Sequence, residues 1–207
     1  MLDSLSFTNS QHSMRPLAIA FAFAIPALFS LTSAHAAAAS PTIEQIQTAV
    51  DAGVAKNASR IPLAVRVTSV AGCRPSPQVT QETVCLVGMS AGMRDGFMVL
   101  PLRQDGAAWT GVERKDAEFP GPTPDQAKAA MNAWAEHELA SNPEAAKDEQ
   151  IKAVPSIGVK AVERCEVARK TGYLQCDATL AIPGKADVTT DFTFALDGAG
   201  WRFIPRR

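Results

Sequence analysis

Residues 165–201 read CEVARKTGYLQCDATLAIPGKADVTTDFTFALDGAGW, and residues 73–109 read CRPSPQVTQETVCLVGMSAGMRDGFMVLPLRQDGAAW. In both stretches the first cysteine and the final tryptophan are 36 positions apart, and the tryptophan ends an Asp-Gly-Ala-x-Trp run. A second cysteine follows the first after 12 positions in one stretch (Cys85) and after 11 in the other (Cys176). The chain therefore contains an internal duplication, with a cysteine pair in each copy.

Four cysteines allow three disulfide pairings, and the repeat selects one of them. Only the pairing of Cys73 with Cys85 and of Cys165 with Cys176 keeps each bridge inside its own copy. Closing a loop of this size stabilises the folded state by about 3 kcal/mol in the chain-entropy model. Zinc is the alternative for four cysteines, but the gaps within each pair are much longer than the usual spacing of about two to four residues between zinc ligands.

A secretory signal is predicted over residues 1–36. Arg15 precedes an apolar run at 17–29, and an Ala-x-Ala site at 34–36 follows it, which is the order typical of a cleaved signal. Since a signal normally begins close to its positive charge, we expect translation to start at Met14. A membrane anchor is the alternative, but the run is shorter than the ~20 residues that a spanning helix needs.

Export places the mature chain in the periplasm or outside the cell, where disulfides persist. The whole chain has 20 Lys and Arg against 21 Asp and Glu, and these charges are spread over both copies. This balance argues against nucleic acid or an anionic membrane surface as a partner. We expect no membrane span after the signal is removed.

The first copy is predicted to begin with a helix and continue as strands. Thr42 to Gln45 fits a capping box, and apolar residues then recur at helical spacing up to about residue 57. Two nearby prolines predict a loop at residues 74–77, because proline cannot sit in a central strand. The expected strands cover residues 63–70, 84–89, 96–103 and 109–112.

The second copy starts after the Phe-Pro-Gly-Pro boundary at residues 119–122. Thr123 to Gln126 repeats the capping box, which predicts a second helix that breaks at Asn142-Pro143 and is followed by a short helix to about residue 153. This copy is eleven residues longer before its first cysteine, with the extra residues around 137–147. The expected strands cover residues 157–165, 172–181, 187–196 and 200–205.

The predicted fold class is α+β, with two tandem modules at residues 37–119 and 120–207. Each module has one helix on a four-stranded antiparallel sheet and one disulfide. In outline, each module resembles cystatin-like and NTF2-like folds. The tandem arrangement also looks like the β-lactamase inhibitory protein family, in which two helix-plus-sheet units each carry a disulfide, and this resemblance implies an inhibitor-like use.

Catalytic residues are not predicted. His137 is the one histidine of the mature chain, but its neighbours Glu136 and Glu138 point about 100° away around a helix and cannot form a dyad with it. The carboxylate pairs at residues 163/166 and 187/191 are interpreted as surface residues rather than as glycosidase acids. Since no nucleophile or zinc-hydrolase motif is present, we predict a protein without enzymatic activity and without a cofactor.

Three methionines lie within ten residues, Met89, Met93 and Met98. Thioethers are soft ligands that suit Cu(I), so copper binding is one interpretation of this cluster. Core packing is the other interpretation, and we favour it because no histidine or free cysteine is nearby. No metal site is therefore predicted.

Residues that occur twice at equivalent positions are most simply requirements of the fold. Trp109, Trp201, Phe192 and Phe194 are predicted on this ground to be core residues. Function is expected where the copies differ, in their loops and in the eleven-residue insert. The candidate partner-binding residues are Arg74, Met93, Arg94, His137 and the only tyrosine, Tyr173, which we place at a hairpin tip.

The leading hypothesis is an exported, non-enzymatic protein of the inhibitor or immunity type that binds an unidentified protein partner through its sheet faces or loops. The alternative is a carrier of a small ligand, with an apolar pocket under a helix lined by Met89, Met98, Phe97 or Trp109. An enzyme of unrecognised type is a third hypothesis, which would need polar residues converging in a cleft. A deep apolar cavity would favour the carrier, and a filled core would favour the partner-binding protein.

Overall fold

The computed structural model describes residues 40–56, 64–198 and 200–206. The predicted secretory signal and the predicted start at Met14 lie outside these residues. The described residues belong to one compact unit, Ala39–Arg207, which holds two four-stranded antiparallel sheets with helices packed against them. The predicted α+β class with two helix-plus-sheet modules is confirmed, whereas the division into domains between residues 119 and 120 stays a prediction.

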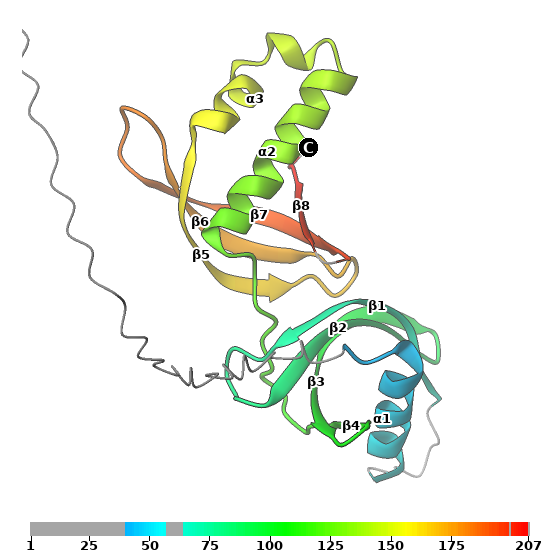
Figure 1. Cartoon of the computed structure of the whole chain (residues 1–207). Coiled ribbons are helices and arrows are strands. Elements are labelled where there is room, and N and C mark those ends of the chain that lie inside the picture. Colours follow the sequence, from blue (N-terminus) through cyan, green and yellow to red (C-terminus); the bar gives the residue numbers. More distant parts are fainter. Residues whose placement is uncertain (1–39, 57–63, 199, 207) are drawn as a thin grey trace, which may run out of the picture. The chain divides into compact units, whose positions relative to one another are not determined.

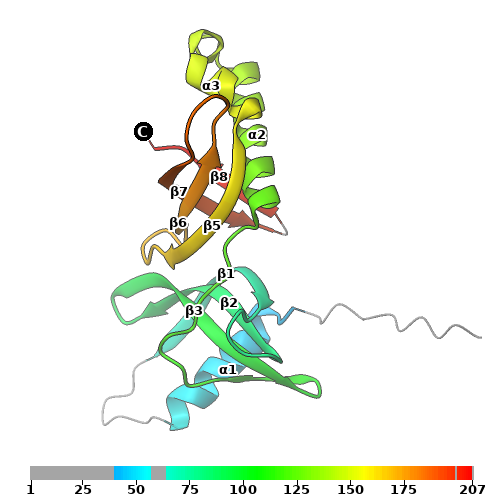
Figure 2. The same ribbon diagram turned by 90° about the vertical axis from the view of Figure 1, so that its left-hand side faces the viewer.

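The first module consists of one helix and a meander of strands in the order β1-β2-β3-β4. Its elements are α1 (Ile43–Lys56), β1 (Val65–Pro75), β2 (Glu82–Ala91), β3 (Arg94–Asp105) and β4 (Ala108–Gly111). The predicted capping box is present: the Thr42 N–H donates to Gln45 Oε1 at 2.9 Å, and the Gln45 N–H donates to Thr42 Oγ1 at 3.3 Å. Figures 1 and 2 show α1 on one face of this sheet.

The second module repeats this plan with a longer helical part and the strand order β5-β6-β7-β8. Its elements are α2 (Pro124–Ser141), the short 3-10 helix η1 (Ala145–Lys147), α3 (Glu149–Ala153), a second 3-10 helix η2 (Val154–Ser156), β5 (Gly158–Val167), β6 (Leu174–Ala181), β7 (Val188–Asp197) and β8 (Gly200–Ile204). The second capping box has the same two hydrogen bonds, between Thr123 and Gln126, at 3.0 and 3.3 Å. The break at Asn142-Pro143 is also found, because Asn142 caps the end of α2.

Both predicted disulfides are present. Cys73 bonds to Cys85, its direct partner across β1 and β2, and Cys165 bonds to Cys176 across β5 and β6. The two modules also share a β-bulge that was not predicted from the sequence. Each first strand has a bulge at the equivalent position, after Val67 in β1 and after Val159 in β5. A bulge bends its strand, so the two sheets share a local bend as well as a disulfide.

One prediction about the first sheet was wrong. Arg74 and Pro75 do not belong to a loop, because β1 continues through Pro75 and pairs Arg74 with Val84 and Pro75 with Thr83. The loop begins at Ser76. Proline is tolerated here because β1 is an edge strand, so the N–H that proline lacks is not needed by a second neighbour.

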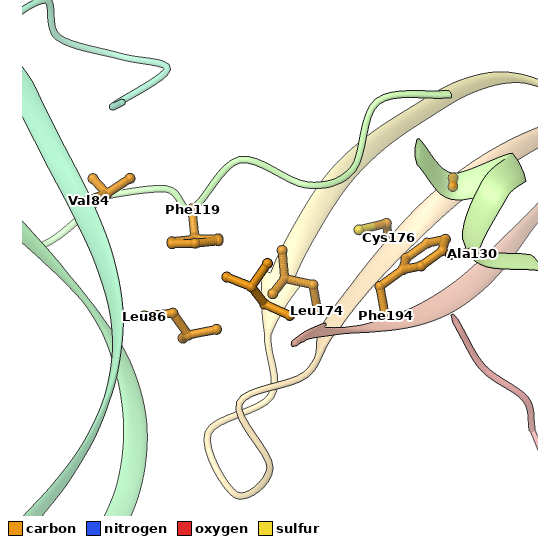
Figure 3. Packing of buried hydrophobic residues seen from close by; sticks show 9 residues of the cluster. Val84, Leu86, Phe119, Ala130, Leu174, Cys176 and Phe194 are labelled. Atoms are coloured by element: carbon orange, nitrogen blue, oxygen red, sulfur yellow. The ribbon is translucent and has the colours of Figure 1, made fainter. Parts of the chain in front are cut away.

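Strand β2 is buried on both of its faces. Cys85 and Val87 face α1 and pack with Ile46 and Trp109, whereas Val84 and Leu86 belong to a different cluster. That second cluster contains residues from both modules. Its buried members are Val84, Leu86, Phe119, Ala127, Ala130, Leu174, Cys176, Phe194 and Leu196 (Figure 3). The modules therefore share apolar core, and burying both faces of β2 explains its uninterrupted apolar run at residues 84–87.

A hairpin loop of the second module contacts β3 directly. The Phe97 N–H donates to the Arg169 carbonyl at 2.7 Å, and the Phe97 ring lies over Gly172. A Cβ placed on Gly172 would come within 2.6 Å of the ring. Gly172 also has a φ of +70°, where glycine is favoured. Both the contact and the backbone conformation therefore require glycine at this position.

The substitution Gly172→Ala should destabilise the protein by more than backbone strain alone. Gly184→Ala is a matched control, because Gly184 has a φ of +73° but nothing within 4 Å of the added Cβ. We expect a loss of about 1 kcal/mol for Gly184→Ala and of about 2–4 kcal/mol for Gly172→Ala, measured by urea unfolding. Equal losses would show that Phe97 does not pack on Gly172.

Candidate functional site

An apolar pocket lies between α1 and the sheet of the first module. Its volume is ≈ 640 Å³. The wall is formed by residues from α1, the start of β1, β2, β3, β4 and the segment that follows β4. The lining residues are Ala49, Val50, Ala52, Gly53, Val54, Lys56, Val65, Met89, Ala91, Met98, Leu100, Thr110, Gly111, Val112 and Glu113. Charged residues are few, which is typical of a pocket that binds an apolar molecule.

Exposed apolar side chains gather at this pocket. Val54 is 39% exposed and Met98 is 47% exposed, and both line the pocket. The other large apolar residues exposed in the described part of the chain are Ile43, Met93 and Val188, and none of them lines it. Both side chains are already more than half buried, so covering the exposed remainder would contribute about 1 kcal/mol for each.

A pocket of ≈ 440 Å³ occupies the equivalent place in the second module. The capping boxes align Val50 with Met131 and Gly53 with Trp134. Strand pairing aligns the sheet positions, because Leu100 and Phe192 each pair with the second cysteine of their module. The pairs that line both pockets are Val50/Met131, Gly53/Trp134, Val65/Ile157, Met89/Leu180, Met98/Thr190, Leu100/Phe192 and Gly111/Phe203.

The two pockets differ mainly in three side chains. Where the first module has Gly53, Leu100 and Gly111, the second has Trp134, Phe192 and Phe203. These three rings pack edge to face, with the Trp134 and Phe203 centroids 5.4 Å apart and those of Phe192 and Phe203 5.1 Å apart. The aromatic rings therefore narrow the pocket of the second module to ≈ 440 Å³, whereas the pocket of the first module, which has no ring among its lining residues, measures ≈ 640 Å³.

Among the described residues, no atom near Gly53 excludes a side chain. A Cβ added there would meet no atom within 4 Å. Glycine inside a helix costs about 0.5–1 kcal/mol relative to alanine, so stability alone does not favour it at this position. A locally unfavourable residue that keeps a pocket open is a sign of a functional site rather than of a packing requirement.

The insert in the second module covers the helix position that stays exposed in the first. Ala135 is equivalent to Val54 but is fully buried, and it packs with Val154 at the end of the short helices that follow α2. Lys128 holds this cover in place, because its Nζ donates to the Val154 carbonyl at 2.7 Å. Burial lowers the pKa of Lys128. Among the described residues, the first module has no equivalent of α3, and Val54 is exposed.

The structure places the five predicted partner-binding residues in three different regions. His137 and Tyr173 line one groove of ≈ 730 Å³ between α2 and β8, together with Trp201. Met93 and Arg94 lie together at the β2–β3 turn, where Met93 is fully exposed. Arg74 is on β1, where its guanidinium donates to the Cys73 carbonyl at 3.3 Å. These five residues do not form a single surface.

Two expectations about aromatic residues need correction. Tyr173 is not at a hairpin tip, because it follows the turn that ends at Gly172 and is half-buried beside β6. Trp201 is only half-buried, unlike its equivalent Trp109, because the α2 residues that face it in the groove include the small Ala130 and Ala133. The predicted core positions of Trp109 and Phe194 are confirmed.

Other candidate chemistry is not supported by the geometry. Asp187 pairs with Lys160 and Asp191 with Arg206, each at 2.6 Å, so these carboxylates are already engaged on the surface. Within residues 40–56, 64–198 and 200–206, no group of three or more His, Cys, Asp or Glu side chains could hold a metal ion. Met89 and Met98 both line the apolar pocket, whereas Met93 lies outside it.

The pocket was only partly foreseen from the sequence. The carrier hypothesis named Met89 and Met98 correctly, but Phe97 packs in the shared cluster and Trp109 in the closed core of the first module. Gly53 and Val54 were missed. A signal for them was available, because aligning the two capping boxes places Gly53 opposite Trp134 and Val54 opposite Ala135.

The fold and the pockets define a duplicated, disulfide-bonded α+β protein with a helix–sheet pocket in each module, the smaller of which is lined by aromatic rings. A comparison of the chain with protein-family models, curated proteins and solved structures finds no match. No helix in the described part of the chain is both long enough and apolar enough to cross a bilayer.

Methionine oxidation should report the exposure of the pocket. With dilute hydrogen peroxide, we expect Met93 and Met98 to form sulfoxide about ten times faster than Met131, which is only 3% exposed. Peptide mass spectrometry over a time course measures these rates. In denaturant the three rates should converge, and a folded protein that oxidises Met131 as fast as Met98 would contradict the described packing.

Proposed function

We propose that this chain is an exported binding protein without enzymatic activity, and that it carries a small, mainly apolar molecule in the pocket beneath α1. The observation that carries this proposal is the difference between the side chains that line the two pockets at equivalent positions. Gly53 and Gly111 line a pocket of ≈ 640 Å³ in the first module, whereas their equivalents Trp134 and Phe203 narrow the pocket of the second module to ≈ 440 Å³. A volume of ≈ 640 Å³ falls within the range of about 300–1,000 Å³ that is usual for small-molecule sites.

The energetics also support binding of an apolar molecule. The exposed parts of Val54 and Met98 would be covered by a ligand in the pocket, and each Å² of apolar surface removed from water contributes about 25 cal/mol. Met89 and Met98 are unbranched and polarizable, so they adapt to ligands of irregular shape. These wall residues therefore favour a ligand whose binding free energy comes mainly from apolar contacts.

Export of the chain is part of the same proposal. Both disulfides join residues close in the sequence, and such bridges persist in oxidising compartments. The apolar run at residues 17–29, after Arg15 and before the Ala-x-Ala site, supports a secretory signal. We therefore place the carrier in the periplasm or outside the cell.

Binding of a neutral apolar fluorophore, N-phenyl-1-naphthylamine, tests the pocket. We expect its fluorescence to rise with wild-type protein and Gly53→Trp to weaken binding at least about tenfold, because the indole fills the space as Trp134 does in the second module. Thr48→Trp is the matched control, since it adds the same side chain to the exposed face of α1 outside the pocket. Equal binding by both variants, each folded by circular dichroism, would reject this site.

A protein partner is the second candidate function, and one observation favours it. The turn between β2 and β3 presents Met93, which is 103% exposed, beside the exposed Arg94. An exposed methionine next to an arginine on a tight turn is suited to contact with another protein, because both residue types are enriched at interfaces.

Site-specific crosslinking separates this candidate from the carrier. A photoreactive residue at Met93 should give discrete crosslinked products in the exported protein fraction. The same residue at Ala107, on the exposed turn between β3 and β4, is the control. Identical products from both positions would show that the Met93 turn has no partner of its own.

A further inference from the structure

The wall of the first-module pocket favours a flexible aliphatic ligand over a flat aromatic one. Its described lining residues include two methionines, several valines, one leucine and small residues, but no aromatic ring. The equivalent pocket of the second module is lined by Trp134, Phe192 and Phe203. Without a ring to stack on, a planar aromatic ligand loses the offset and edge-to-face contacts that such ligands make. An alkyl chain can follow thioether and branched aliphatic side chains without that loss.

The rim of the same pocket provides one positive charge. Lys56 is the last residue of α1 and lines the pocket, and it forms no ion pair with any described residue. Glu113 also lies on the rim but already has an interaction partner. The hydroxyl of Thr110 donates to the Arg103 carbonyl at 3.3 Å. Lys56 is thus the rim group available to meet the charged end of a ligand.

We infer that the ligand is an unbranched alkyl chain ending in a carboxylate, with the chain along Met89, Met98 and Leu100 and the carboxylate beside Lys56. This inference rests on the proposed carrier function and specifies its ligand class. The ammonium group of Lys56 attracts an anion and repels a cation, whereas the apolar wall excludes a second charge from the interior. Glu113 is the other charged residue of the lining, and because it already has an interaction partner, Lys56 is the group that we assign to the carboxylate.

Assigning the ligand as an alkyl carboxylate predicts two effects on Kd. Each methylene transferred from water to the wall should tighten Kd roughly fourfold, until the chain is longer than the pocket. The carboxylate should add about a two- to fivefold preference over the matching primary alcohol, because an ion pair with an exposed lysine is weak. Chain length should therefore matter more than the head group.

Displacement of N-phenyl-1-naphthylamine from the full exported chain tests both effects. The competitors are saturated carboxylates and the matching primary alcohols of roughly eight to sixteen carbons. We expect the steep dependence on chain length in both series and tighter binding of the carboxylates.

Lys56→Gln should abolish the preference for carboxylates and leave the chain-length dependence unchanged. Lys170→Gln is the control, because it removes an exposed lysine that does not line the pocket.

The possible outcomes separate the ligand class from the carrier function. If the fluorophore binds in a manner sensitive to Gly53→Trp but neither series shows a chain-length dependence, the alkyl ligand is wrong and the carrier stands. If carboxylates and alcohols bind equally, or if Lys56→Gln changes nothing, the assignment of the carboxylate to Lys56 is overturned. If neither the fluorophore nor the alkyl carboxylates, titrated directly by calorimetry, bind the wild-type protein, the carrier function itself fails.

Discussion

The packing of one helix against one face of a four-stranded sheet, carried out twice, is the constraint on which the rest of this structure depends. A capping box starts each helix at the equivalent point, and a disulfide ties the first two strands beneath it. The space between helix and sheet then depends on the side chains that line it and, in the second module, on the segment after α2 that packs on Ala135. Where the first module has Gly53 and Gly111, the second has Trp134 and Phe203, and the pocket measures ≈ 640 Å³ in the first module and ≈ 440 Å³ in the second.

Burial of the opposite face of the first sheet explains why the pocket lies where it does. Val84 and Leu86 pack with Phe119 and Leu174 in the shared cluster, so that face of β2 is not available to a ligand. On the face toward α1, Ile46 and Trp109 close the core. Of the large apolar side chains that are exposed in the described part of the chain, Val54 near the end of α1 and Met98 on β3 line this pocket.

Much of the fold could be predicted because its signals depend on residues close in the chain. Capping boxes, hairpin turns and the spacing of the cysteine pairs are local patterns, and the structure follows them. The two wrong predictions, for Pro75 and Trp201, concern residues whose surroundings depend on their place in the sheet or in the core. Pro75 is acceptable only because β1 is an edge strand, and Trp201 is half-exposed only because Ala130 and Ala133 face it across a groove. Neither condition can be deduced from the residues adjacent to Pro75 or Trp201.

The sequence by itself determined the duplication, the disulfide pairing and the succession of a helix and four strands in each copy, since all three follow from repeated residues and local periodicity. The tertiary structure alone decided which of the equivalent positions enclose a pocket and which are filled. A pocket is bounded by residues far apart in the chain, such as Gly53, Met98 and Gly111, and its volume depends on what each of them leaves empty. The sequence lists those side chains, but only folding brings them around a common space.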